Sequence, residues 1–303
     1  MNRGGGLSPQ PNVAAGMLYA LAGFACLSCG DGLIKSMSGE WPGTAVAALR
    51  YTFGALGLGL ILLIKEGPQG FRMPLPKVQL ARGIFVSIAT ITFFSSIFVM
   101  PLATATSIQF LAPLLTAIIS AILLGEKLSR GRWIATVLAF IGVMIVLRPS
   151  FADLGLTAIL PLLAALGMSG MMMANARAAG SGSVLLMQFL IAAVAAPILI
   201  VAATLGHLSG YAPLAVGWPG WHVITICAIV AVTASFSHMM IYTATVRSSA
   251  ATVAPMVYVQ ILVAIGIGVV FYNDYPDLVA LAGTGLIIAS GLFLLRQSRA
   301  RHG

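Results

Sequence analysis

Residues 104–150 read TATSIQFLAPLLTAIISAILLGEKLSRGRWIATVLAFIGVMIVLRPS, and their pattern indicates the class of fold. It contains two apolar runs, which we place at about 103–124 and 132–147, with a short charged turn between them. A helix needs about 20 apolar residues to cross a bilayer. The stretch therefore predicts two membrane-spanning helices joined by a tight turn.

The composition of the whole chain extends this prediction beyond the quoted stretch. Of its 303 residues, 59% are hydrophobic and only 8% are charged, and the mean hydropathy is +1.02. A soluble protein carries about 25% charged residues, so this chain lacks the polar side chains to cover a water-facing surface. A soluble globular protein, a disordered chain and a nucleic-acid-binding domain are excluded, and three cysteines are too few for a disulfide framework.

The apolar runs predict an all-α membrane protein with ten transmembrane helices. Their approximate bounds are 13–34, 44–64, 80–99, 103–124, 132–147, 154–176, 184–205, 222–245, 250–272 and 278–295. At about 20 residues a span, these runs leave only short connections and no room for a sizeable water-soluble domain.

The basic residues indicate the orientation of these helices. The chain has 16 Lys and Arg against 7 Asp and Glu, and the bases lie mostly between the spans. With the N-terminus inside, thirteen of the sixteen bases lie on the cytoplasmic side, Lys35 and Arg148 lie outside, and Arg50 lies within a span. The positive-inside rule then predicts a multi-pass protein of the cytoplasmic (inner) membrane with both termini in the cytoplasm.

The quoted stretch has a counterpart in the second half of the chain. Residues 249–298 read SAATVAPMVYVQILVAIGIGVVFYNDYPDLVALAGTGLIIASGLFLLRQS. Both stretches begin with small and hydroxyl residues, carry an early proline, break at an acidic turn and end a Gly-rich span in Leu-Arg. Each half holds five spans, an odd number, so the second half enters the membrane from the opposite side. We therefore expect two inverted repeats, at 13–150 and 154–297, flanked by cytoplasmic tails at 1–12 and 298–303.

The two stretches resemble the EamA family of the drug/metabolite transporter superfamily. The resemblance rests on the turn LLGEKLSRGRW with Glu126, on Gly142 in the next span, and on the second-half run from Ser237 to Arg296. The run YND at 272–274 departs from the Phe-Gly-Glu or Phe-Gly-Asp that the family more often shows before the last loop. The resemblance implies two inverted five-helix bundles around a central cavity and alternating access, with amino acids, nucleotide-like metabolites, vitamins or drugs as substrates.

Arg50 is the sharpest candidate for substrate binding. It lies about six residues inside its span, hence roughly 9 Å deep at 1.5 Å per residue, and a charge at mid-membrane costs about 2.5–3.5 kcal/mol on insertion scales. Three explanations remain open: Arg50 faces a cavity, extends toward the outer interface, or pairs with Asp31 near the outer end of the first span. A pair at a cavity mouth would also suit a gate.

Other polar residues within the spans are candidates for binding or coupling. Gln109 in the first half and Gln260 with Tyr258 in the second occupy roughly corresponding places, near the midplane where transporters bind substrate. Hydrogen bonds between helices account for them equally well. His238 makes protons a candidate coupling ion, together with Asp31, because histidine titrates near physiological pH. A neutral histidine bonded between helices is the competing explanation.

Two further pairs of residues complete the candidate set. Phe94 and Ser95 place aromatic and hydroxyl surface side by side in the third span and are further substrate-binding candidates. Pro113 and Pro255 lie inside spans at similar places in the two repeats. Each proline removes a backbone hydrogen bond and can kink its helix, and paired kinks suit helices that rock.

These residues favour a secondary transporter that moves a small organic metabolite, amino-acid-like and zwitterionic or anionic, or a drug by alternating access. A passive channel or facilitator for small solutes is the alternative, and an intramembrane enzyme is a third class. The chain has no Walker A, G-x-S-x-G or H-E-x-x-H motif. We expect no catalytic residue, no cofactor, no metal site and no nucleic-acid partner. The expected partners are the small-molecule substrate, the lipid bilayer and protons, and the expected state is a monomer or homodimer.

Overall fold

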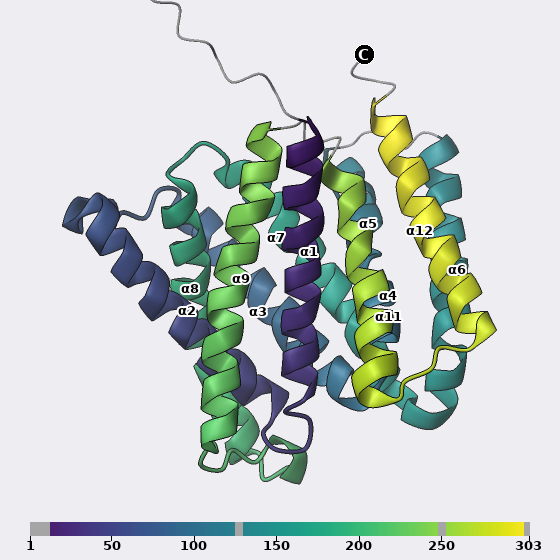
Figure 1. The fold of residues 1–303 in the computed structure, drawn as a ribbon, viewed down its shortest axis with the longest axis horizontal. Helices are drawn as coiled ribbons and strands as arrows, with labels where there is room; N and C mark the ends of the chain where they lie inside the picture. The colour runs from purple at the N-terminus through teal and green to yellow at the C-terminus, as the bar shows by residue number, and fades with distance from the viewer. Residues whose placement is uncertain (1–12, 125–129, 248–252, 300–303) are drawn as a thin grey trace, which may run out of the picture.

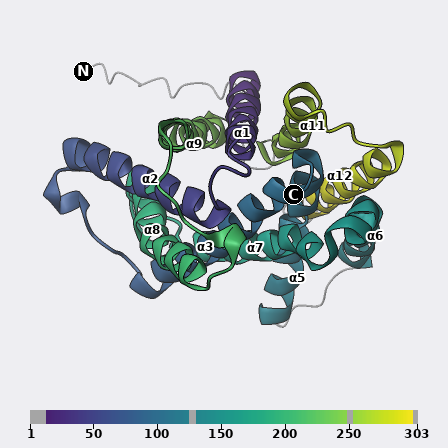
Figure 2. The ribbon, with the colours of Figure 1, turned by 90° about the horizontal axis from the view of Figure 1, so that it is seen from below.

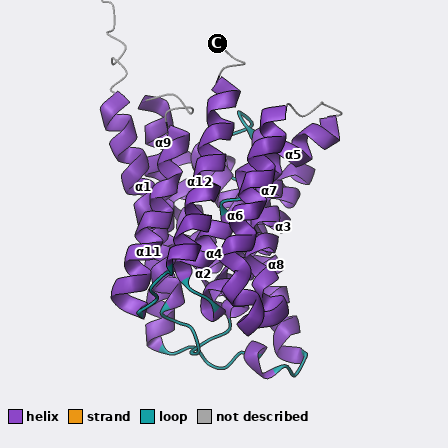
Figure 3. Cartoon of the chain, turned by 90° about the vertical axis from the view of Figure 1, so that its right-hand side faces the viewer, coloured by secondary structure: helices purple, strands orange, loops and turns teal. Residues whose placement is uncertain are grey.

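A computed structural model describes residues 13–124, 130–247 and 253–299, and the acidic turn with Glu126 and the tail at 1–12 lie outside them. The described residues form helices, turns and loops without a strand (Figure 3). The α-helices are α1 (Val13–Lys35), α2 (Gly43–Glu66), α3 (Pro76–Val99), α4 (Leu102–Gln109), α5 (Ala112–Leu124), α6 (Arg130–Leu154), α7 (Leu160–Ala178), α8 (Val184–Leu208), α9 (Trp221–Arg247), α11 (Val259–Tyr272) and α12 (Leu278–Arg299). The short 3₁₀ turns are η1 (Pro68–Gly70), η2 (Gly155–Ile159), η3 (Ala212–Leu214) and η4 (Ala254–Tyr258).

Each predicted span coincides with a helix or with two consecutive helical segments, and most ends differ by a few residues. The largest difference is α6, which continues to Leu154, whereas hydropathy ended that span at 147. Hydropathy falls at Arg148 and Pro149, but a proline at this point removes only one backbone donor and the helix continues for another turn.

Prolines set several helix ends. The span predicted at 103–124 is divided, since α4 ends at Gln109 and α5 begins at Ala112. Pro113 has no N–H to donate to the carbonyl of Gln109, four residues earlier, so a continuous helix would leave that carbonyl unpaired. In the second half Pro255 lies in η4, directly before α11. An irregular turn therefore precedes the main helix at both places.

The described helices have the length and composition of membrane spans. Seven of them, with α4 and α5 taken together, are long and apolar enough to cross a bilayer, and three shorter apolar helices lie at Trp133–Val146, Met256–Tyr272 and Leu278–Phe293. Large apolar side chains on their outer faces are exposed, for example Ile64 (75%) and Phe271 (73%). Such exposure suits contact with lipid and not with water. The chain is an all-α membrane protein.

The helices pack in pairs that join the two halves of the chain. The most extensive contacts are α1 with α9, α3 with α7, α2 with α8 and α6 with α12. Figure 2 shows α2, α3, α8 and α9 on one side, α1 and α7 in the middle, and α5, α6, α11 and α12 on the other side. Two apolar clusters follow this division, one around Phe93, Ile97 and Leu199 and one around Leu111 and Ile261.

Close helix packing depends on glycine at one crossing in particular. A Cβ atom at Gly142 of α6 would lie 2.8 Å from the carbonyl oxygen of Gly283 of α12, and a Cβ atom at Gly283 would lie 2.8 Å from the carbonyl oxygen of Gly142. Any side chain at either position would push the two backbones apart. Small residues at helix crossings are the usual way in which membrane helices approach each other.

The first residue of α1 and the last residue of α12 lie at the same end of the bundle, at the top of Figure 1. We call this the terminal end, and we call the other the opposite end. Because the chain reverses direction after each span, α2, α7 and α9 finish at the terminal end and α8 begins there. The loops that join α1 to α2 and α8 to α9 lie at the opposite end.

Candidate functional site

A central cavity of about 510 Å³ lies between the two halves of the chain. Its walls come mainly from α1, α2, α3, α7, α8 and α9, while α4 and α11 contribute Gln109 and Gln260. The lining reaches Val184, the first residue of α8, at the terminal end. Toward the opposite end it stops at Asp31 and Phe94, about one helical turn before α1 and α3 finish. The cavity is therefore deeper on the terminal side.

Arg50 of α2 lines this cavity and is held there by aromatic rings. Its guanidinium carbon lies 5.1 Å from the ring centroid of Tyr51 and 5.6 Å from that of Phe94. Tyr51 is fixed in turn by a hydrogen bond of 3.1 Å between its hydroxyl and that of Thr90. A cation over an aromatic face gains about 0.5–2 kcal/mol. These contacts orient the guanidinium without using its N–H donors, which remain available to a ligand.

Asp31 of α1 lines the same cavity without pairing with Arg50. Among the described residues the ion pairs within 4 Å are Lys35 with Asp274 and His222 with Glu40. The side chain of Asp31 accepts no hydrogen bond from any described residue either. Of the explanations that the sequence left open for Arg50, direct pairing with Asp31 is therefore not realised. One unpaired cation and one unpaired anion face a common cavity.

Neutral polar side chains complete the lining. Gln109, Gln188, Gln260 and His238 all line the cavity, and none of their side chains forms a hydrogen bond to another described residue. Gln260 is fixed through its backbone instead, since its carbonyl accepts a 2.9 Å hydrogen bond from the hydroxyl of Ser28. Polar groups inside a protein normally have a partner. A bound ligand or water is the partner that the cavity offers them.

The remaining predicted residues lie outside the lining. Ser95 follows Phe94 on α3 but does not line the cavity. Tyr258 is buried in the second apolar cluster, where its ring centroid lies 5.5 Å from that of Phe110. Pro113 lies beside the break between α4 and α5 and not in the cavity wall, and Pro255 lies in η4, before α11. Among the described residues, no group of three His, Cys, Asp or Glu side chains is placed to hold a metal ion.

A second group of charged residues, which hydropathy did not single out, lies at the opposite end. The Nζ atom of Lys35 lies 2.7 Å from Oδ2 of Asp274 and donates a 2.9 Å hydrogen bond to the carbonyl of Met100. Lys35 also lies over the ring of Tyr272, whose hydroxyl donates to the carbonyl of Gly32 at 2.7 Å. These contacts join α1, the α3–α4 connection and the end of α11. The only sequence signal was the pair of opposite charges at the ends of distant spans.

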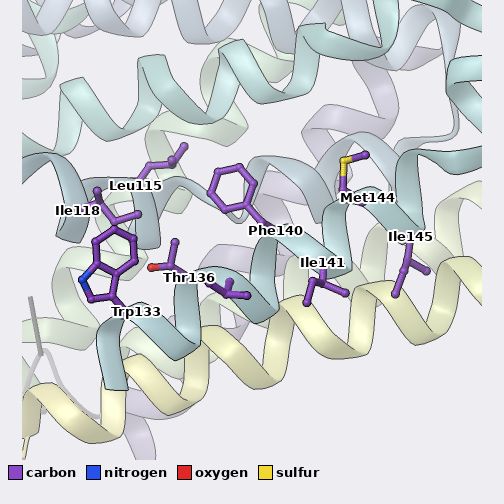
Figure 4. Close-up of a pocket in the computed structure, with 9 residues that line it drawn as sticks. Leu115, Ile118, Trp133, Thr136, Phe140, Ile141, Met144 and Ile145 are labelled. Atoms are coloured by element: carbon purple, nitrogen blue, oxygen red, sulfur yellow. The ribbon is translucent and has the colours of Figure 1, made fainter. Parts of the chain in front are cut away.

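A larger groove on the outer face differs from the cavity in chemistry. It has a volume of about 960 Å³ and lies between α5 and α6. Figure 4 shows Leu115 and Ile118 of α5 with Trp133, Phe140 and Met144 of α6 along it. None of the described residues that line it is charged, and Met144 is 61% exposed. This groove suits lipid chains, so the charged central cavity is the candidate site.

Comparison with known proteins agrees with this architecture. Residues 14–148 match the EamA-like transporter family. The chain is 23% identical to the S-adenosylmethionine uptake transporter of Rickettsia prowazekii (94% of this chain and 93% of the relative). It is 26% identical to the pseudopaline exporter of Pseudomonas aeruginosa (94% and 97%) and 22% identical to the riboflavin transporter of Rhizobium johnstonii (88% and 85%).

A solved crystal structure of another protein has a similar fold. The TM-score is 0.59 at 20% sequence identity, and the match covers 96% of this chain and 99% of that one. At this identity the likeness concerns the fold alone. The family match in the first half, the end-to-end similarity to three metabolite transporters and the helical membrane architecture agree with one another. Over most of its length the chain is similar to membrane transporters of small metabolites, and its first half matches the EamA-like transporter family.

Proposed function

We propose that the protein is a secondary carrier that moves a small zwitterionic or anionic, amino-acid-like metabolite across the cytoplasmic membrane by alternating access. The observation that carries this proposal is the pair of opposite, unpartnered charges, Arg50 and Asp31, in one cavity between the two halves. Each charge within a membrane costs several kcal/mol unless something compensates it. A ligand that brings a carboxylate to Arg50 and a cationic group to Asp31 supplies that compensation.

The relatives support this choice of substrate class. They are named as transporters of S-adenosylmethionine, pseudopaline and riboflavin, which are small organic metabolites. S-adenosylmethionine carries an α-amino acid group, with a carboxylate and an ammonium. The cavity of about 510 Å³ accommodates a ligand of metabolite size. We therefore assign Arg50, Phe94, Gln109 and Gln260 to substrate binding.

The helix contacts support two inverted repeats. If 13–150 and 154–297 are equivalent, α1 corresponds to α7, α2 to α8, α3 to α9 and α6 to α12. Exchanging the halves then turns the α1–α9 contact into the α7–α3 contact and the α2–α9 contact into the α8–α3 contact, and both contacts of each pair occur. The α2–α8 and α6–α12 contacts map onto themselves, as expected at a two-fold axis. Carriers with such repeats alternate access by rocking one bundle against the other.

The basic residues support a cytoplasmic terminal end. Lys65, Arg177 and Arg247 lie in the last turns of α2, α7 and α9, which all finish there, whereas Lys35 lies at the opposite end. The positive-inside rule places the more basic end in the cytoplasm. With this orientation the cavity reaches toward the cytoplasm and the Lys35–Asp274 pair closes the outer side. Asp31 and His238 are the titratable candidates for coupling transport to protons.

Counterflow in proteoliposomes tests the proposal. Purified protein is reconstituted with unlabelled substrate inside and labelled substrate outside, with S-adenosylmethionine, methionine and other amino acids as the panel. A carrier accumulates label transiently against its gradient because each exchange needs a loaded binding site. A passive channel only equilibrates the label. Absence of saturable, counterflow-driven uptake for every member of the panel contradicts the proposed function.

A further inference from the structure

A second arginine is buried beside the cavity near its terminal end. Arg82 of α3 is only 4% exposed. Its Nε donates to Oδ1 of Asn175 on α7 at 2.6 Å, and its Nη2 donates to the carbonyl of Met187 on α8 at 3.3 Å. Its Nη1 donates to Oε1 of Gln79, which is also buried. Arg82 is one of the thirteen bases that the sequence assigned to the cytoplasmic side, but its guanidinium lies inside the bundle.

All of these acceptors are neutral. Within the described part of the chain no carboxylate lies within 4 Å of the guanidinium, since the ion pairs found there involve Lys35 and His222. Burying a cation without a counter-ion is costly even when its N–H groups are bonded. A purely structural tie between α3, α7 and α8 needs no such cation. The charge therefore calls for a function.

The geometry fixes which end of the Asn175 amide faces the cavity. An arginine offers only donors, so the carbonyl oxygen of Asn175 must face Arg82. The amide nitrogen Nδ2 then points away from the guanidinium, and it donates to no other described residue. Asn175 lines the cavity, whereas Arg82, Gln79 and Met187 do not. Arg82 thus orients the side-chain amide of Asn175 so that its two N–H donors are directed to the cavity.

We propose that Arg82 is a positioning residue that holds the Asn175 amide as a hydrogen-bond donor to an oxygen of the transported substrate, a carboxylate or carbonyl oxygen. This inference rests on the proposed function and adds a second recognition point to Arg50. A hydrogen bond that Asn175 accepts from a cation polarises the amide and strengthens the bonds that its own N–H groups donate. A ligand without an acceptor at this point leaves the donors unpaired, and that is how a site rejects it.

The substitution Asn175→Asp separates this role from a structural one. The carboxylate still accepts from Nε of Arg82, and the added negative charge compensates the buried cation, so folding is preserved. The donors that face the cavity are lost, and an acceptor takes their place. We expect the KM for counterflow of S-adenosylmethionine to rise about 10- to 100-fold, the range that corresponds to one unsatisfied hydrogen bond, while the melting temperature stays the same or rises.

The matched control is Gln79→Glu. It makes the same amide-to-carboxylate change on another acceptor of Arg82, outside the cavity lining. We expect its KM to stay within about twofold of wild type. A second measurement applies if Asn175→Asp folds poorly. A cysteine introduced by Asn175→Cys should react with a thiol reagent, and S-adenosylmethionine should protect it. A cysteine introduced by Gln79→Cys should not react.

The outcomes separate the two proposals. A raised KM for Asn175→Asp alone, or protection of the cysteine at position 175, supports the inference. A wild-type KM for Asn175→Asp, an equal effect of Gln79→Glu, or a cysteine at 175 that S-adenosylmethionine does not protect overturns it while the carrier assignment stands. A wild-type protein that exchanges no member of the panel overturns the proposed function itself, and the inference with it.

Discussion

The Lys35–Asp274 pair yields a prediction about the opening of the opposite end of the bundle. In the structure the pair connects α1 to the end of α11 at 2.7 Å, with side chains that are 11% and 24% exposed. If this contact is made only while the opposite end is closed, Asp274→Ala removes stabilisation from the closed form alone. The open form then becomes more populated, because the substitution destabilises the closed form and leaves the free energy of the open form unchanged.

The expected size follows from the burial of the pair. A hydrogen bond to a charged group contributes about 1.5–3 kcal/mol, whereas an exposed ion pair contributes about 0–1 kcal/mol. The low exposure of both side chains places the Lys35–Asp274 contact at about 2 kcal/mol. Because 1.4 kcal/mol corresponds to a factor of ten, Asp274→Ala should raise the open fraction about 30-fold. The chain supplies a matched control in the pair of His222 and Glu40.

Cys26 lines the cavity and serves as a native reporter once the other two cysteines are replaced. An impermeant maleimide is added on the side opposite the termini, and the rate of labelling measures the open fraction. Asp274→Ala should speed labelling about 30-fold. Glu40→Ala should change it less than about threefold, since His222 and Glu40 are 56% and 47% exposed. If the labelling rate of Asp274→Ala is unchanged, or if the two variants are labelled at equal rates, the Lys35–Asp274 pair does not control the opening of this end.

Three further predictions concern orientation, binding and charge. A cysteine introduced by Gln69→Cys, in the exposed turn η1, should react with an impermeant reagent only from the cytoplasmic side; labelling from outside contradicts the proposed topology. Arg50→Lys should impair transport with nearly normal expression, because lysine keeps the charge but loses the planar fork; a fully active Arg50→Ala shows that the guanidinium is not needed. In thermal-shift assays at pH 6 and pH 8, zwitterionic amino acids should stabilise the protein more than their N-acetylated forms do, and His238→Ala should reduce any dependence on pH. Selective binding of cations that lack a carboxylate, unaffected by pH or by His238→Ala, contradicts both the charge preference and the proton coupling.

The helices were predictable because the bilayer allows few alternatives. A segment such as Val184–Leu208, apolar except for Gln188, Thr204 and His207, has to be a helix, since an unpaired backbone group in lipid is too costly. At Pro113 the sequence predicted a kink within one span, whereas the structure has a break after Gln109, because Pro113 lacks the N–H that the carbonyl of Gln109 needs. The end of α6 could not be predicted in this way. Hydropathy falls at the charged Arg148, but a helix ends where its backbone hydrogen bonds end.

The site was only partly predictable, because hydropathy measures depth and not direction. It identified Arg50, Asp31, Gln109, Gln260 and His238 as polar residues within spans, and all of them line the cavity. Hydropathy also identified Tyr258 as a polar residue within a span, but its ring packs against Phe110 and not in the cavity. Whether a polar residue faces a cavity or a neighbouring helix depends on how each helix is rotated. That rotation is set by packing partners from distant parts of the sequence.

The charges of the lining favour a zwitterion over a simple anion. Among the described lining residues, Arg50 and Asp31 alone carry a formal charge when His238 is neutral, so the charges of the lining balance although the two do not touch. An anion bound at Arg50 would neutralise the cation and leave the carboxylate of Asp31 as an uncompensated charge in a low-dielectric cavity. A zwitterion meets both charges and leaves the balance unchanged. On the proposed function, the separation of Arg50 from Asp31, which leaves each charge uncompensated until a ligand bridges them, is the feature that gives a zwitterionic substrate its advantage.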